Sequence, residues 1–148
     1  MFLLDSNVYI AAFTDPAFGP AFRLFHQAQL PRLVLSAVVA HELLVGARTP
    51  ARRRDLERGL LKPFHTRQRL HVPARSTWEL AAEIDRRLRA RGGYTASLAQ
   101  RSFANDILLA ATARELGATI ITLNVADFQI IQQALPFKFQ APWPDHAA

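Results

Sequence analysis

The sequence has no cysteine and no long apolar run, and each absence narrows what the protein can be. Without cysteine there are no disulfides, thiolate metal sites or cysteine nucleophiles, which agrees with a reducing compartment. Any metal ligands must therefore be oxygen or imidazole groups. The longest uncharged apolar stretch, residues 33–40, is far below the ~18 residues that a membrane span needs, and no basic leader precedes the first carboxylate. We therefore expect a soluble, cytoplasmic protein with no membrane partner.

Basic residues outnumber acidic ones, 18 Lys plus Arg against 12 Asp plus Glu, for a net charge of +6. Four acids each lie at the edge of an apolar run: Asp5, Glu42, Asp106 and Asp127. The rest of the chain then carries 18 − 8, or +10. An acidic spot in a basic body suits a polyanionic substrate, whose phosphates approach carboxylates only where bound cations reverse their sign. The alternative is that the basic charge only keeps the protein soluble. Composition alone supports the two interpretations equally.

The 148 residues, half of them apolar, predict one domain with a proper core. Short apolar or β-branched runs predict strands at residues 2–4, 33–35, 70–73, 119–122 and 137–139. Helical patterns cover residues 6–13, a stretch after Pro20, and residues 36–46, 51–61, 76–91, 105–117 and from 123. The segment 93–100 suggests a loop, and residues 137–148 an edge strand with a proline-rich tail. This order predicts an α/β sandwich with a mainly parallel, short-stranded sheet.

Ligands of a parallel α/β sheet bind outside the carboxyl ends of its strands. Asp5 ends the first predicted strand, and Asn124 and Asp127 follow the fourth, so these groups share one edge. Glu42 and Asp106 fall on helices and need the tertiary fold to join them. The alternative for each is an ordinary solvated carboxylate on a helix, or an acid favoured by the dipole at a helix N-terminus. For Asp106, taken by itself, this alternative is the better explanation. The five histidines show no metal-ligand spacing and are expected to be structural or surface residues.

Four short motifs lie in order along the chain and carry a family resemblance. They are Leu-Leu-Asp-Ser-Asn at 3–7, Glu-Leu-Leu-Val-Gly at 42–46, Asn-Asp at 105–106 with Ala-Ala-Thr-Ala at 110–113, and Thr-Leu-Asn-Val-Ala-Asp-Phe at 122–128. Each is weak alone, but their order and spacing are specific. The chain resembles PIN-domain ribonucleases, most closely VapC toxins of toxin-antitoxin pairs, over nearly its whole length. The resemblance implies a PIN-like α/β/α sandwich with acids clustered at one edge of a parallel sheet.

The resemblance also implies roles for single residues. Asp5, Glu42 and Asp106 match the family's catalytic, metal-binding acids, and Asp127 would lie near or on the metal shell. The expected cofactor is Mg2+ or Mn2+, because carboxylate oxygens are hard ligands and clustered acids repel one another until a cation neutralises them. One or two ions would activate water to hydrolyse an RNA phosphodiester without a protein nucleophile. Supporting roles are expected for Ser6, Asn105, Thr122 and Asn124.

The partners implied by the resemblance are an RNA substrate, a cognate antitoxin that covers the acidic site, and a second copy in a homodimer. Phenylalanines of the first two helices would line the antitoxin's groove or else belong to the core: Phe13, Phe18, Phe22 and Phe25. Two arginine clusters are weaker candidates for RNA contacts, since a charge run is more often a solvated helix face. They comprise Arg52, Arg53, Arg54 and Arg58, and Arg86 and Arg87.

Other functions fit parts of the pattern. A housekeeping RNA-processing nuclease of the same fold would share the acids, and a neighbouring antitoxin gene would separate the two. A catalytically silent PIN-like interaction module would use the acids only to bind a partner's basic residue. An aspartyl phosphotransferase or receiver domain is disfavoured, because Asn7 replaces the second acid of the former and neither Lys62 nor Lys138 follows a suitable strand. The RNA target and the number of ions stay open.

Overall fold

Five parallel strands form the centre of the protein, which the computed structural model describes over residues 1–144. The strands are β1 (Phe2–Leu4), β2 (Leu33–Ser36), β3 (Leu70–His71), β4 (Thr119–Ile121) and β5 (Lys138–Gln140). Their order is β3-β2-β1-β4-β5, and every neighbouring pair runs parallel. The predicted parallel sheet of short strands is thus confirmed. The predicted tail continues beyond the described residues at 145–148.

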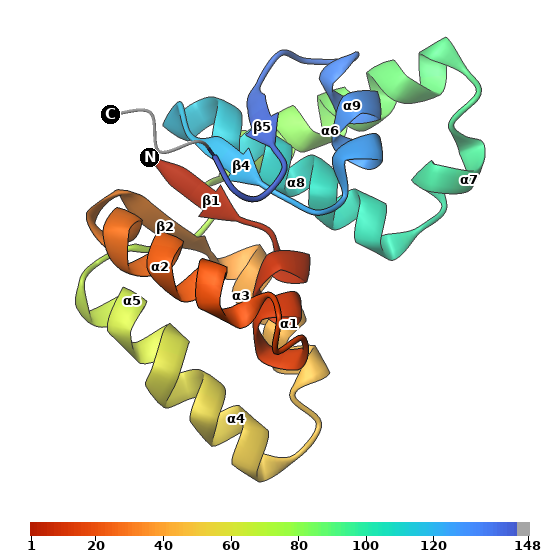
Figure 1. The fold of residues 1–148 in the computed structure, drawn as a ribbon. Coiled ribbons are helices and arrows are strands. Elements are labelled where there is room, and N and C mark those ends of the chain that lie inside the picture. The colour runs from red at the N-terminus through yellow and green to blue at the C-terminus, as the bar shows by residue number, and fades with distance from the viewer. Residues whose placement is uncertain (145–148) are drawn as a thin grey trace.

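Helices cover both faces of this sheet (Figure 1). One face carries the red to yellow-green helices α1 (Ser6–Thr14), α2 (Gly19–Gln29), α3 (Ala37–Gly46), α4 (Pro50–Leu56) and α5 (Lys62–Thr66). A short 3-10 turn, η1 (Leu30–Arg32), leads from α2 into β2. The other face carries α6 (Arg75–Arg91), α8 (Arg101–Leu116) and α9 (Val125–Gln132), and the short α7 (Thr95–Leu98) joins α6 to α8. This is the predicted α/β/α sandwich.

Capping residues set the helix boundaries near the sheet. Ser36 ends β2, and its hydroxyl accepts a 3.2 Å hydrogen bond from the backbone N–H of Val38 in the first turn of α3. Thr49 caps α4 in the same way. Gly117 closes α8 with a left-handed backbone at φ 63°, a conformation that glycine adopts without strain. All three signals are readable in the sequence, and the first places Glu42 in the second turn of α3.

Two predicted segments differ from the structure. Residues 93–100 were expected as a loop, but α7 occupies four of them, and the Tyr94 hydroxyl beside it donates to Gln133 on the α9 side. The helix predicted for 51–61 continues to Thr66 through a π-helical stretch, η2 (Glu57–Leu61). In a regular α-helix the Pro63 ring would clash with the carbonyl four residues earlier, and the wider π turn relieves that clash.

The core is built on both sheet faces, and α8 is its most buried helix. From Phe103 to Ala113 almost every side chain of α8 is buried, including Ile107 and Leu109. A helix that is apolar all round belongs in the interior, so α8 is a rigid support for the polar residues near its start. Trp78 of α6, in contrast, is 58% exposed. Within residues 1–144 no helix is long and apolar enough to cross a bilayer.

The central strands β1 and β4 define the place where a ligand can enter. The chain leaves β1 toward β2 on one side and leaves β4 toward β5 on the other. Such a reversal opens a crevice between the carboxyl ends of the two strands, which is where open α/β sheets bind ligands. The register pairs Leu4 with Ile121, so the next residues, Asp5 and Thr122, lie side by side in that crevice.

Candidate functional site

Asp5 is the most buried of the four predicted acids, with 3% of its surface exposed. It caps α1, and its Oδ1 accepts a 2.7 Å hydrogen bond from the backbone N–H of Ser6, whose hydroxyl lies 3.5 Å from the same atom. Its Oδ2 accepts from the Thr122 hydroxyl at 2.8 Å and from the Asn7 amide at 2.8 Å. Neutral donors therefore fix the orientation of both oxygens.

Thr122 and Asn7 join the ends of β1 and β4. The fully buried Thr122 hydroxyl donates to Asp5 and accepts from the backbone N–H of Asn124 at 2.9 Å. The Asn7 side chain lies 3.3 Å from that hydroxyl, and its carbonyl oxygen accepts from the backbone N–H of Leu123 at 3.1 Å. The sequence pattern predicts a supporting Thr122 but misses Asn7. Its position in the first turn after a helix-capping acid was the available signal.

Asp106 enters the same crevice from α8 and is 8% exposed. The amide nitrogen of Asn124 donates to Asp127 Oδ2 at 2.7 Å and lies 3.3 Å from Asp106 Oδ2. Asn124 immediately precedes α9, and Asp127 lies in the first turn of that helix. One neutral amide thus bridges carboxylates from two helices, and the supporting role expected of Asn124 stays a prediction.

Glu42 reaches the site from the opposite helical layer. The Asn105 amide of α8 donates to Glu42 Oε1 at 2.8 Å, across 63 residues of sequence. This contact ties α3 to α8 over the end of the sheet. Since Asn105 and Asp106 are adjacent, one turn of α8 serves two of the acids.

The electrostatics show that the four carboxylates share one environment. Burial raises the pKa of Asp5, and the charge of Glu42 adds to the rise, while the hydrogen bond from Thr122 acts against it. Burial also raises the pKa of Asp106 to about 8, with further contributions from the charges of Asp5, Asp127 and Glu42. The charges of the neighbouring acids therefore disfavour the ionised forms of Asp5 and Asp106. Among residues 1–144, none of the four acids has an ion pair with a basic side chain.

The donor set fits a hard divalent cation. It consists of carboxylate oxygens, hard ligands of the kind that Mg2+ prefers, in a negative spot that no basic side chain of residues 1–144 neutralises through an ion pair. Within the described part of the chain, no three acidic or histidine side chains form a group that could by itself hold a metal ion. Mg2+ does not need one, because it usually keeps several waters and takes only one or two carboxylates. The arrangement excludes a closed, all-protein site rather than a hydrated ion.

The two arginine clusters lie in different situations. Arg86 and Arg87 both bind Glu83 on α6, at 2.7 and 2.8 Å, and Arg87 also donates to the carbonyl of Ala134. Their hydrogen bonds lower the pKa of Glu83 to about 2. Arg58 lies 3.8 Å from Asp55. Within residues 1–144 the other three arginines of that cluster, Arg52, Arg53 and Arg54, have no ion pair.

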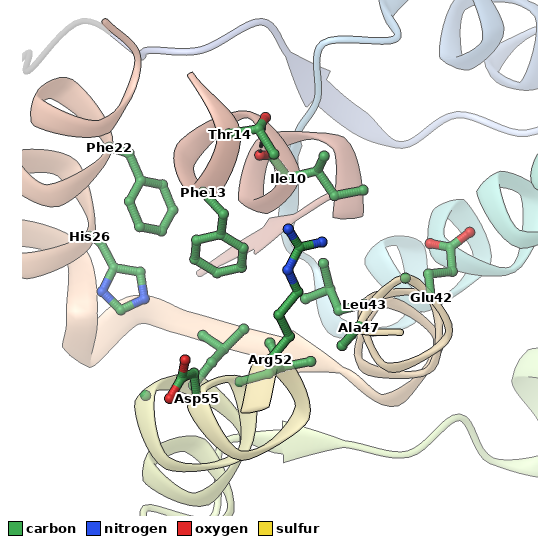
Figure 2. A pocket seen from close by; sticks show the side chains of 14 residues that line it. Ile10, Phe13, Thr14, Phe22, His26, Glu42, Leu43, Ala47, Arg52 and Asp55 are labelled. Carbon is green, nitrogen blue, oxygen red and sulfur yellow. Dashed lines mark hydrogen bonds between the residues drawn. The ribbon is translucent and has the colours of Figure 1, made fainter. Parts of the chain in front are cut away.

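A groove of about 660 Å3 lies between the α1–α2 pair and the α3–α4 pair, with Glu42 at its edge (Figure 2). Its walls are mainly apolar and include Ile10, Phe13, Phe22, Leu43, Leu56 and Leu60. Of the four phenylalanines considered from the sequence, Phe13 and Phe22 line this groove. Phe25 belongs to the core, and Phe18 packs against Trp143 with ring centroids 5.4 Å apart.

The fold and the site together define a class: an α/β protein with a parallel sheet and a carboxylate cluster at its switch point. The chain belongs to the PIN-domain family, whose description, PIN domain, matches residues 2–131. Comparison with curated proteins gives no significant sequence match.

Three solved structures with similar chains agree with this fold. A chain of FitAcB from Neisseria gonorrhoeae has a TM-score of 0.74 and 23% identity, over 97% of this chain and 99% of that one. A chain of FitAB bound to an IR36 DNA fragment has a TM-score of 0.73 and 22% identity, over 97% and 96%. A chain of VapBC-1 from nontypeable Haemophilus influenzae has a TM-score of 0.63 and 22% identity, over 95% and 96%. At these identities the likeness concerns the fold.

Proposed function

We propose that the protein is a metal-dependent endoribonuclease that hydrolyses RNA phosphodiester bonds with Mg2+ or Mn2+. The observation that carries the proposal is the gathering of four carboxylates at one crevice of a basic protein, where amides and hydroxyls hold them and no basic side chain of residues 1–144 forms an ion pair with them. An uncompensated acidic pocket is costly to maintain. A bound divalent ion removes that cost and makes the pocket attractive to phosphate.

The chain's own residues divide the work. Asp5 and Asp106 are the most buried acids and would hold the ion, with Glu42 and Asp127 at the rim. Thr122, Asn7 and Asn124 keep the carboxylates in place through the hydrogen bonds described above. A bound ion supplies a water of lowered pKa and a charge opposite the scissile phosphate. Ser6 and Thr122 use their hydroxyls on Asp5, so neither is needed as a nucleophile.

The direct test is RNA cleavage by Asp5→Asn and Asp106→Asn proteins with Mg2+ or Mn2+. Each substitution keeps the side-chain shape and removes one charge, and we expect activity to fall by about 100-fold or more. Glu79→Gln is the matched control, because Glu79 is exposed and, in the part of the chain that the structure describes, pairs only with Arg75 on α6. Full activity in both Asn variants would reject the nuclease assignment.

A second part of the proposal concerns biology: the enzyme acts as the cytoplasmic toxin of a toxin-antitoxin pair. Its likeness to chains of FitAB and VapBC structures and the apolar groove beside Glu42 support a cognate protein partner. Induced expression should arrest growth, co-expression of a small neighbouring gene should relieve the arrest, and mapped RNA ends should reveal the target. A housekeeping nuclease would process RNA without arrest. We also expect a homodimer, which light scattering on the purified protein measures.

A further inference from the structure

The groove between α1–α2 and α3–α4 contains one basic side chain, that of Arg52, and no ion pair within residues 1–144 balances its positive charge. Three charged residues line it: Glu42, Arg52 and Asp55. Glu42 accepts a hydrogen bond from Asn105, and Asp55 lies 3.8 Å from Arg58. Within the described chain, the Arg52 side chain has neither an ion pair nor a hydrogen bond.

Arg52 differs from the other arginines of α4 in where its side chain lies. Arg52 extends from the start of α4 toward α1, and its guanidinium points between Phe13 and Leu43 (Figure 2). The neighbouring arginines of α4 do not line the groove. An arginine on a helix surface normally turns its charged end to solvent. Arg52 is likewise exposed, but its charged end lies beside apolar groove walls, so a partner that covers those walls would also cover the guanidinium.

The groove walls favour a protein segment over RNA. Phe13 is 58% exposed and Ile10 48% exposed, and both are on α1. Exposed apolar walls between helices suit the apolar face of an amphipathic helix, whereas single-stranded RNA follows positively charged grooves. A segment that covers Ile10 and Phe13 also removes water from Arg52. A desolvated guanidinium is costly unless a carboxylate pairs with it.

We infer that Arg52 is a specificity residue for a helical protein partner that places an Asp or Glu opposite it in this groove. The inference rests on the proposed function in one respect, the existence of a protein partner. It assigns what that partner must contain: apolar side chains for α1 and one acid for α4. A partner with a lysine or glutamine at that position is rejected, because it leaves the buried charge repelled or unpaired.

The test is a displayed library of amphipathic peptides of about 16 residues, long enough for an isolated helix to form. The library is selected against Asp5→Asn protein, so that RNA cleavage plays no part, and against the same protein with Arg52→Glu. We expect one position to enrich Asp or Glu on the first target and Lys or Arg on the second. Synthetic peptides differing only there should show at least ~10-fold weaker binding when the charge is mismatched.

Two further targets control the selection. Arg53→Glu makes the same change of charge on a neighbouring residue that does not line the groove, and the acidic preference should remain. Phe13→Asp places a charge on the apolar wall and should abolish the enrichment. Four outcomes would overturn the inference. In three of them the selected peptides show no acidic preference, keep the same preference on Arg52→Glu, or are still enriched on Phe13→Asp. The fourth outcome is that no peptide binds.

The last experiment measures the binding of a labelled single-stranded oligoribonucleotide to the Arg52→Glu and Arg53→Glu proteins. If Arg52→Glu weakens RNA binding far more than Arg53→Glu while no peptide preference exists, the groove serves RNA and the inference fails. The outcomes are separable from those of the proposed function. An active Asp5→Asn enzyme would reject the nuclease site and leave the peptide result standing, and the reverse also holds.

Discussion

The Asn105 amide donates a 2.8 Å hydrogen bond to Glu42 Oε1, and this single contact joins helices from opposite faces of the sheet. It fixes a carboxylate that otherwise stands on a partly exposed helix surface. Asn105 therefore acts through Glu42 and is a positioning residue for the proposed chemistry.

Removal of this amide should impair the proposed RNA cleavage more than the fold. We expect Asn105→Ala to reduce RNA cleavage about 10-fold, since a hydrogen bond to a charged group contributes about 1.5–3 kcal/mol. The free energy of unfolding should fall by less than this, because Asn105 and Glu42 are only partly buried and water can replace the lost hydrogen bond. Asn105→Asp should be worse, because it adds a fifth negative charge to the site. Cleavage assays at several Mg2+ concentrations measure the effect, and an Asn105→Ala enzyme with unchanged activity at low Mg2+ would contradict it.

Thr122 should matter for stability as well as for activity. Thr122→Val keeps the shape of this buried side chain but removes the hydroxyl that donates to Asp5 and accepts from the Asn124 backbone. We expect the free energy of unfolding to fall by about 1.5–3 kcal/mol. Thr122→Ser keeps the hydroxyl and should lose only about 1 kcal/mol for the missing methyl group. Urea denaturation measures both, and equal losses in the two variants would count against the hydrogen-bond role.

The metal-free protein should lose stability as pH rises toward 8. Asp106 has a folded pKa of about 8 against an ordinary 3.8, so between these values the folded state holds a proton that the unfolded state releases. The contribution of Asp106 to the free energy of unfolding is therefore fully present below pH 4 and is lost as the pH rises through 8. Asp106→Asn should raise stability at pH 8.5 by at least about 1 kcal/mol, since one pKa unit corresponds to about 1.4 kcal/mol.

Divalent cations should reverse this effect. Mg2+ added at pH 8.5 should raise the melting temperature of the wild-type protein and have little effect on Asp106→Asn. Glu57→Gln, an exposed acid on η2, is the control and should respond to Mg2+ as the wild type does. If the wild-type melting temperature ignores both Mg2+ and Mn2+, the acidic cluster is not a cation site.

His26 should make the fold sensitive to acid. Its ring packs against Phe22 and Phe64, with centroids 5.2 and 5.9 Å away, and its buried Nε2 has no hydrogen-bond partner among residues 1–144. Burial, helped by the charge of Arg67, lowers its pKa below the ordinary 6.5. The unfolded state then binds the proton first, so stability falls as pH drops below 6.5. His26→Phe should flatten thermal stability between pH 7 and 5, and His65→Phe, at an exposed site, should not.

Much of the site was accessible to sequence reasoning. Asp5 and Asn124 follow parallel strands, and the carboxyl ends of such strands meet at one edge whatever the details of the fold. The pairing of Arg86 and Arg87 with Glu83 was equally accessible, because residues three and four apart share a helix face. Arg52 was grouped with its neighbours from the sequence, and only the packing of α4 against α1–α3 separates it from Arg53.

By itself, the sequence determined the parallel α/β architecture, the caps at Ser36 and Gly117, and the identity of four candidate acids, since these depend on local pattern. Only the tertiary structure decided that Glu42 and Asp106 reach Asp5, that Asn7 and Asn105 hold the acids, and that one arginine lies in an apolar groove. The physical reason is the separation along the sequence of the residues that interact. Strand ends and caps depend on residues a few positions apart, whereas side-chain hydrogen bonds across 63 and 117 residues depend on how two helical layers close over the sheet.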